Sequence, residues 1–151
     1  MRQEKTLEEA YDSCISQGYL NEMHKVDLAK INSNLHLVDE LVESAKDDSH
    51  KQRWSAGYDS FYSALHLLVE AFLIFDKARS SNHQCLFAYL CYKHSELELE
   101  WGFFERIRTR RNGINYYGNP ITAEKFKEDK LGFELYINLL WKEILEKMKH
   151  G

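Results

Sequence analysis

The sequence predicts an all-α protein, an up-and-down antiparallel bundle of about four long helices with shorter helices packed on it. Three observations lead to this fold class. The 151 residues contain a single proline, Pro120, so almost no position forbids a helix. Apolar residues recur at spacings of three and four over long stretches, and no stretch alternates as a strand would. A hydrophobic fraction of 44% supplies enough material for a core and argues against disorder.

The apolar periodicity predicts six helices, at residues 6–17, 25–46, 50–78, 82–93, 96–115 and 123–149. The helix at 50–78 is apolar on more than one side, so we expect it at the centre of the bundle. Short connections between long helices favour antiparallel neighbours. Four of the starts carry the capping-box pattern, Thr6 with Glu9, Ser49 with Gln52, Ser81 with Gln84 and Ser95 with Glu98.

Length, charge and cysteine content restrict the class of protein. The chain is long enough for one ordinary domain, which we place at residues 1–151. A net charge of -4 gives no bulk attraction to nucleic acid or to anionic lipid. The three cysteines, Cys14, Cys85 and Cys91, are odd in number and form no CxxC pair, which predicts reduced thiols, no metal site and a cytoplasmic location. No apolar run reaches the roughly 18 residues that cross a membrane.

The segment ERIRTRRNGINYYG, residues 105–118, concentrates positive charge and aromatic character within a chain that is acidic overall. In the helix at 96–115, Arg111 continues the apolar stripe that includes Phe104 and Ile107. A guanidinium keeps its charge, so burying it costs several kcal/mol unless acceptors meet it. We therefore expect one of two arrangements. Either Asp59 or Glu70 on the central helix pairs with Arg111, or this position opens into a cleft that binds an anion.

A second face of the same helix carries Arg108, Asn112 and Tyr116, each four residues after the previous one. Arg111 and Tyr116 are five residues apart, about 140° around an ideal helix. Convergence of these two side chains therefore predicts that the helix loosens between them. Gly113 lies there, and its permissive backbone allows the last turn to distort or stop.

The residues from 54 to 117 resemble the HEPN domains of higher eukaryotes and prokaryotes. The resemblance includes the central helix SAGYDSFYSALHLLVEAFLIF, the turn SSNHQCLFAYL and the ending RIRTRRNGINYYG. The hallmark of that family is an arginine, usually followed by a polar residue, then about four further residues and a histidine near the end of a bundle helix. Arg111 and Asn112 match the first two positions, and Tyr116 stands where the nuclease members have histidine.

The resemblance implies two functions, neither of which uses a cofactor. Active members are metal-independent ribonucleases that work as dimers, many of them toxins paired with a nucleotidyltransferase-like antitoxin. Their histidine acts as general acid or base and their arginine holds the phosphate. Tyrosine, with an ordinary pKa near 10, is a poor proton shuttle at neutral pH. We therefore expect a homodimeric module that binds a nucleotide, an RNA phosphate or a partner protein through Arg108, Arg111, Asn112 and Tyr116, without efficient catalysis. The alternative is a ribonuclease with Arg111, Asn112 and Tyr116 as catalytic residues.

The same residues can also be explained by a purely structural role. A third possible function is that of a helical adaptor without any ligand. Arg111 and Asn112 would then form an ion pair and a helix C-cap network, and the other arginines of the segment, Arg106, Arg108 and Arg110, would form a solvated face. Tyr116 and Tyr117 would be packing residues. Among the histidines, His66 is expected in the core and His83 at a helix cap. The apolar surface of residues 51–79 is the expected dimer interface.

Overall fold

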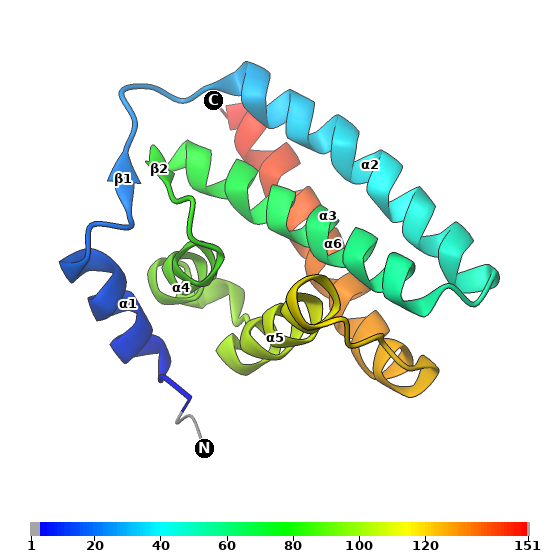
Figure 1. Ribbon diagram of the computed structural model, residues 1–151. Helices are drawn as coiled ribbons and strands as arrows, with labels where there is room; N and C mark the ends of the chain where they lie inside the picture. The colour runs from blue at the N-terminus through cyan, green and yellow to red at the C-terminus, as the bar shows by residue number, and fades with distance from the viewer. Residues whose placement is uncertain (1–3, 151) are drawn as a thin grey trace.

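Six α-helices account for most of residues 4–150, the part of the chain described by the computed structural model (Figure 1). They are α1 (Leu7–Ser16), α2 (Leu28–His50), α3 (Trp54–Phe75), α4 (His83–Lys93), α5 (Trp101–Tyr117) and α6 (Ala123–His150). A short 3-10 helix, η1 (Ser95–Leu97), precedes α5, and two strands of two residues each, β1 (Asn21–Glu22) and β2 (Ala78–Arg79), complete the fold. The predicted all-α bundle is confirmed. None of the described helices has the length and apolar character needed to cross a membrane.

Helix α3 lies at the centre of the bundle. The antiparallel helix α2 runs along one side of it, and α6 crosses it on another side (Figure 1). Of its 22 residues α3 buries 12, among them Phe61 and Phe72. Each such aromatic side chain contributes roughly 1.5–3 kcal/mol when it is fully buried. The apolar surface of residues 51–79, expected to serve a dimer, is therefore the core of a single chain.

Helices α5 and α6 approach closely at a glycine. A β-carbon at Gly132 of α6 would lie 2.5 Å from the ring of Phe103 on α5, so only glycine fits this contact without displacing the ring. Phe103 in turn packs edge-on against Phe133, with ring centroids 5.7 Å apart. This contact fixes α5 in place and so determines where the arginines of its second half point.

One of the four expected helix caps is confirmed, at α1, where the Thr6 hydroxyl accepts a hydrogen bond from the Glu9 amide at 3.2 Å. The other three were wrong. Helix α2 continues to His50, and α3 begins after Arg53, which makes no side-chain cap. At α4 the capping side chain is that of Asn82, which accepts from the Cys85 amide at 3.0 Å.

The helix expected to start near residue 96 starts later, because the backbone leaves the helical conformation between residues 97 and 101. Ser95 opens only the three-residue η1, and Glu98 then adopts a left-handed conformation with φ of 54°. A left-handed residue interrupts a right-handed helix, so α5 begins later, at Trp101. The strands were not expected either, since two residues cannot display an alternating pattern. β1 pairs antiparallel with β2, with Asn21 opposite Arg79.

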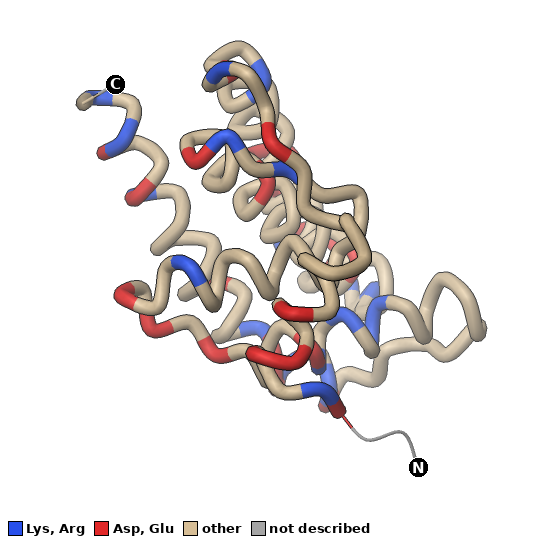
Figure 2. Tube along the Cα trace, turned by 90° about the vertical axis from the view of Figure 1, so that its left-hand side faces the viewer, with Lys and Arg blue, Asp and Glu red and all other residues tan. Residues whose placement is uncertain are grey.

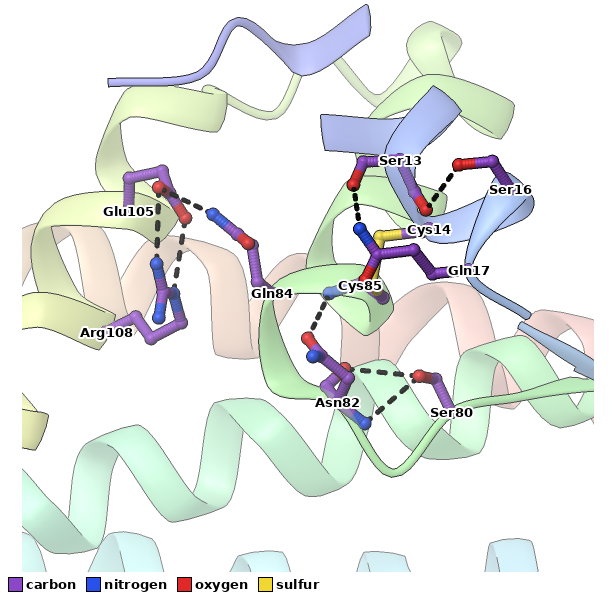
Figure 3. Close-up of a disulfide and its surroundings, with 10 residues drawn as sticks. All are labelled: Ser13, Cys14, Ser16, Gln17, Ser80, Asn82, Gln84, Cys85, Glu105 and Arg108. Carbon is purple, nitrogen blue, oxygen red and sulfur yellow. Dashed lines mark hydrogen bonds and ion pairs between the residues drawn. A yellow bond between two sulfur atoms is a disulfide. The ribbon is translucent and has the colours of Figure 1, made fainter. Parts of the chain in front are cut away.

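The expectation of reduced cysteines was wrong for two of the three. Cys14 of α1 and Cys85 of α4 form a disulfide, with Cα atoms 5.7 Å apart (Figure 3). Helix α1 packs against α4 and brings together two residues 71 positions apart, a pairing that cysteine spacing alone does not reveal. Cys91 is a free, buried thiol, and burial raises its pKa to about 12.

Candidate functional site

The second half of α5 comes directly after the buried residues of the same helix. Phe104 and Ile107 are completely buried, and Arg111 lies one turn beyond Ile107 on the same face. The expected loosening at Gly113 was wrong, because the helix continues through Gly113 to Tyr117. It ends at Gly118, whose left-handed φ of 65° suits glycine and directs its N–H to the carbonyl of Gly113.

A cleft of about 380 Å³ separates the end of α5 from the start of α4. We call it the α4–α5 cleft. Its lining residues come from both helices and from the segment before α4; they are Ser81, Asn82, His83, Gln84, Arg108, Arg111, Asn112 and Tyr116. The lining contains all four of the binding residues predicted from the sequence. Long side chains reach the same space from neighbouring faces of a regular helix, which is why no distortion at Gly113 is needed.

Arg111 has the acidic partner expected for a charged residue on a core-facing stripe. Its Nε donates to Oδ1 of Asp59 at 3.3 Å, and its guanidinium lies 5.1 Å from the centre of the Tyr62 ring. Of the two carboxylates considered, Asp59 is the partner, whereas Glu70 accepts from Asn34 and pairs with Lys30. Among the described residues, Nε is the only Arg111 nitrogen that makes a side-chain hydrogen bond. The terminal nitrogens therefore remain available to a ligand.

Arg108 belongs to a polar chain that joins the two walls of the cleft (Figure 3). Its Nε and one terminal nitrogen donate to the two carboxylate oxygens of Glu105, each at 3.3 Å. Glu105 also accepts a hydrogen bond of 3.1 Å from the side-chain amide of Gln84 on α4. This chain holds α4 against α5 and orients Arg108 at the rim of the cleft.

His83 is a residue of the cleft lining that the sequence analysis did not place there. It had been expected at a helix cap, but Asn82 is the cap and His83 is the first residue of α4. Its Nδ1 lies 3.0 Å from the Tyr62 hydroxyl, and its ring packs against that of His66 with centroids 4.0 Å apart and the ring planes tilted by 31°. Tyr62 and His66 come from adjacent turns of α3 and meet His83 of α4 here, and only the polar turn SSNHQ next to a helix start could have signalled this contact.

Burial and the two arginines keep this histidine pair uncharged at neutral pH. Burial, and then Arg111 and Arg108, lower the pKa of His83. Burial and then the neighbouring His83 and Arg111 lower the pKa of His66 to about 3. His66 is thus a partly buried neutral imidazole behind the cleft, close to the core position expected for it.

Tyr116 reaches the cleft as an exposed side chain. It is 72% exposed and Tyr117 is 75% exposed, so the expectation that both are packing residues was wrong. The C-cap network expected to include Asn112 is also absent from the described residues, because the backbone of Gly118 caps the helix. Asn112 and Tyr116 contribute polar groups to the cleft without structural bonds of their own among residues 4–150.

Arg106, Arg108 and Arg110 were expected to form a solvated face. Two of them, Arg106 and Arg110, instead pair with a buried carboxylate. Asp129 of α6 is completely buried and accepts from Nε of Arg106 at 2.8 Å, from Arg110 at 2.8 Å and from the Tyr58 hydroxyl at 2.7 Å. We call these four residues the Asp129 cluster. Burial and the hydrogen bond to Asp129 raise the pKa of Tyr58. Asp129 lies between Phe126 and Phe133 on the apolar stripe of α6. A carboxylate at such a position is the sequence signal that could have predicted a buried ion pair.

A second cavity, of about 550 Å³, adjoins the cleft and shares Ser81 with it. Its lining combines apolar side chains with polar and charged ones; they are Asn21, Met23, Asp27, Lys30, Glu70, Ile74, Arg79, Ser80 and Ser81. We call it the β1–β2 cavity, because both strands border it. Ser81 is the residue that borders both spaces.

Figure 2 shows basic and acidic residues interspersed along the described trace. No three His, Cys, Asp or Glu side chains of residues 4–150 converge as metal ligands do. Comparison with models of protein families, with curated proteins and with solved structures finds no match for the chain. Membership of the HEPN family therefore stays a prediction that depends on the residues quoted above.

Proposed function

We propose that the α4–α5 cleft binds a phosphate group of a nucleotide or of RNA. The observation that carries this proposal is the position of Arg108, Arg111 and Asn112 at one cleft, where Arg111 makes its hydrogen bond to Asp59 through Nε. Guanidinium groups bind phosphate oxygens through charge-assisted hydrogen bonds in a planar, often bidentate geometry. The N-terminus of α4 borders the same cleft and favours negative charge there.

A nucleotide fits this part of the molecule better than a bare phosphate ion. The β1–β2 cavity adjoins the cleft at Ser81, so a phosphate bound at Arg111 has space beside it for a ribose and a base. Met23 and Ile74 offer apolar contacts, and Asn21 offers an amide able to donate and accept hydrogen bonds. Pockets for small organic ligands combine these two kinds of contact.

We further propose that the chain is a HEPN domain, which would define how the cleft is used. As a HEPN domain the chain would present Arg111 and Asn112 to the phosphate, with Tyr116 in the position of the histidine. A tyrosine at that position gives binding without efficient cleavage. The ribonuclease alternative, with a nucleotidyltransferase-like partner, requires another residue to transfer the proton.

The homodimer remains a proposal, but we now place its interface on a surface other than that of residues 51–79. Many apolar residues of α3 are buried within the chain, and the two most exposed leucines of the described residues are on α6, where Leu131 is 65% and Leu135 is 57% exposed. Sedimentation velocity at micromolar concentration, with Leu135→Glu as the test variant, decides between a dimer through α6 and a monomer. A cytoplasmic location is also a proposal, and the Cys14–Cys85 disulfide weakens it because disulfides persist mainly in oxidising compartments.

The experiment that tests phosphate binding is calorimetric titration with inorganic phosphate, adenosine monophosphate and a short RNA. We expect Arg111→Ala to weaken binding of all three about 10- to 100-fold, as loss of hydrogen bonds to a charged group does. Arg53→Ala is the matched control, because Arg53 pairs with Asp48 and lies outside the cleft. Equal affinities for the wild type and the Arg111 variant would refute the proposal.

A further inference from the structure

The β1–β2 cavity and the α4–α5 cleft follow one another along the chain. Residues 79–81, which lead from β2, line the cavity, and residues 81–84, which lead into α4, line the cleft (Figure 1). Burial lowers the pKa of His83 in the cleft, and the charge of Glu70 in the cavity opposes that shift, so the two side chains lie close enough to interact. One ligand can therefore occupy both spaces.

Helix α3 fixes the distance between the two spaces. At the cleft, the guanidinium of Arg111 lies 5.1 Å from the centre of the Tyr62 ring. Glu70 lines the cavity and follows Tyr62 by eight residues, with His66 halfway, so the three lie on neighbouring turns of one face of the helix. A rise of about 1.5 Å per residue places Glu70 roughly 12 Å along the helix axis from Tyr62. A phosphate held by Arg111 is thus about the length of a nucleotide away from the carboxylate of Glu70.

Glu70 presents a hydrogen-bond acceptor to the cavity. Its Oε1 accepts a hydrogen bond of 3.2 Å from the side-chain amide of Asn34 and lies 3.5 Å from Nζ of Lys30. Asn34 is itself buried, so it holds the carboxylate in a fixed orientation. Oε1 is the only Glu70 oxygen that makes a hydrogen bond among residues 4–150, and the Glu70 side chain is 28% exposed. An ionised carboxylate accepts at about four sites, so Oε2 can still bind the donors of a ligand.

An ionised carboxylate accepts hydrogen bonds and cannot donate them, and this property distinguishes one nucleotide base from the others. The edge of guanine that pairs with cytosine has two neighbouring donors, N1–H and the 2-amino group. Adenine and cytosine have an unprotonated ring nitrogen at that edge, and its lone pair repels a carboxylate. Uracil has a single N–H between two carbonyl oxygens. Arg79, which lines the same cavity, can donate to O6 and N7 of guanine.

We propose that the ligand of the α4–α5 cleft is a guanine nucleotide, whose phosphate binds at Arg111 and whose base lies in the β1–β2 cavity against Glu70. This inference rests on the proposed phosphate site and adds the identity of the base to it. Met23 and Ile74 line the cavity beside Glu70 and supply the apolar contacts that a purine ring needs. Arg111 then provides affinity common to all nucleotides, and Glu70 determines specificity.

The test is calorimetric titration of the wild type with guanosine monophosphate and with adenosine monophosphate. We expect the guanine nucleotide to bind about 10- to 100-fold more tightly, the discrimination that a good bidentate contact gives between bases. Glu70→Gln keeps an oxygen for Asn34 but removes the charge, and the two affinities should then agree within about threefold. Glu40→Gln is the matched control, because Glu40 is 65% exposed on α2 and lies outside both spaces.

A change in the ligand tests the same contact without any variant, so the result does not depend on the folding of Glu70→Gln. The 1-methylated form of guanosine monophosphate has no hydrogen at N1 and should bind as weakly as adenosine monophosphate. Equal affinities of the wild type for guanine and adenine nucleotides, both weakened in Arg111→Ala, would overturn this inference and leave the phosphate site in place. An unchanged preference for guanine in Glu70→Gln, with a thermal unfolding midpoint that shows it folded, would also overturn it. Binding that does not depend on Arg111 would remove both proposals.

Discussion

Two pairs of arginines on the same helix have opposite environments. Arg106 and Arg110 share one completely buried carboxylate, Asp129, whereas Arg108 and Arg111 reach the α4–α5 cleft and pair with partly exposed carboxylates. The Asp59 side chain, for example, is 42% exposed. The four residues occupy six consecutive positions, so the difference arises from which side of α5 each faces.

The difference indicates a division of roles along one helix. Asp129 is a completely buried carboxylate that accepts from Tyr58, Arg106 and Arg110 together, so these contacts stabilise the interior of the bundle. An arginine that uses only one nitrogen for a partly exposed carboxylate keeps donors for an incoming anion. We therefore expect the Asp129 cluster to determine stability and the α4–α5 cleft to determine binding, with little overlap between the two.

The largest effect on stability is expected at Asp129. Asp129→Ala removes the acceptor of Tyr58, Arg106 and Arg110 and leaves buried charge without a partner. Breaking a buried ion pair in this way costs about 3–5 kcal/mol. Urea unfolding measures this loss, with Glu128→Ala as the control, because Glu128 is 52% exposed and its pairing with Arg110 contributes at most about 1 kcal/mol. A variant at Asp129 as stable as the Glu128 control would remove the distinction between the two regions.

The next largest effect is expected at the disulfide that anchors α4, the helix carrying His83. Replacing Cys14 and Cys85 by serine opens a loop of 71 residues and should lower the free energy of unfolding by about 2–4 kcal/mol. Because α1 packs mainly against α4, the loosened wall should also weaken phosphate binding at the cleft. Thermal unfolding and titration with and without reductant measure both effects. A reductant that changes neither would show that the packing of α1 on α4 suffices to hold the cleft.

A smaller effect is expected from the histidines behind the cleft as the pH falls. The pKa of His66 is about 3 in the folded chain and near 6.5 when unfolded, so the unfolded state takes up a proton first. The stability that this difference contributes is complete above pH 6.5 and is lost as the pH falls toward 3. From pH 6.5 to 5 the loss should be about 1–2 kcal/mol, and His66→Gln should reduce it. The same loss in His66→Gln as in the exposed-site control His36→Gln would assign the pH dependence to other groups.

The fold could be predicted because its signal is local and periodic, whereas the site depends on contacts between distant residues. The stripe of α3 and the acidic partner of Arg111 follow from helical spacing, and both are confirmed. The disulfide, the contact of His66 with His83 and the pairing of Arg110 with Asp129 each join segments that only the tertiary structure brings together. The sequence therefore predicted which face of α5 is polar, but not that two of its arginines share a buried carboxylate of α6.

The smallest effect is expected at Tyr116, the residue in the position of the family's histidine. Its side chain is 72% exposed and makes no hydrogen bond among the described residues, so its hydroxyl is solvated in the free protein. Tyr116→Phe should leave stability unchanged and weaken phosphate binding by less than about 0.5 kcal/mol, the low end for a hydrogen bond that competes with water. Titration of Tyr116→Phe beside Tyr117→Phe, its equally exposed neighbour outside the cleft, measures the difference. A loss as large as that of Arg111→Ala would mean that Tyr116 closes onto the bound ligand and that the role of the motif position has been kept by a different side chain.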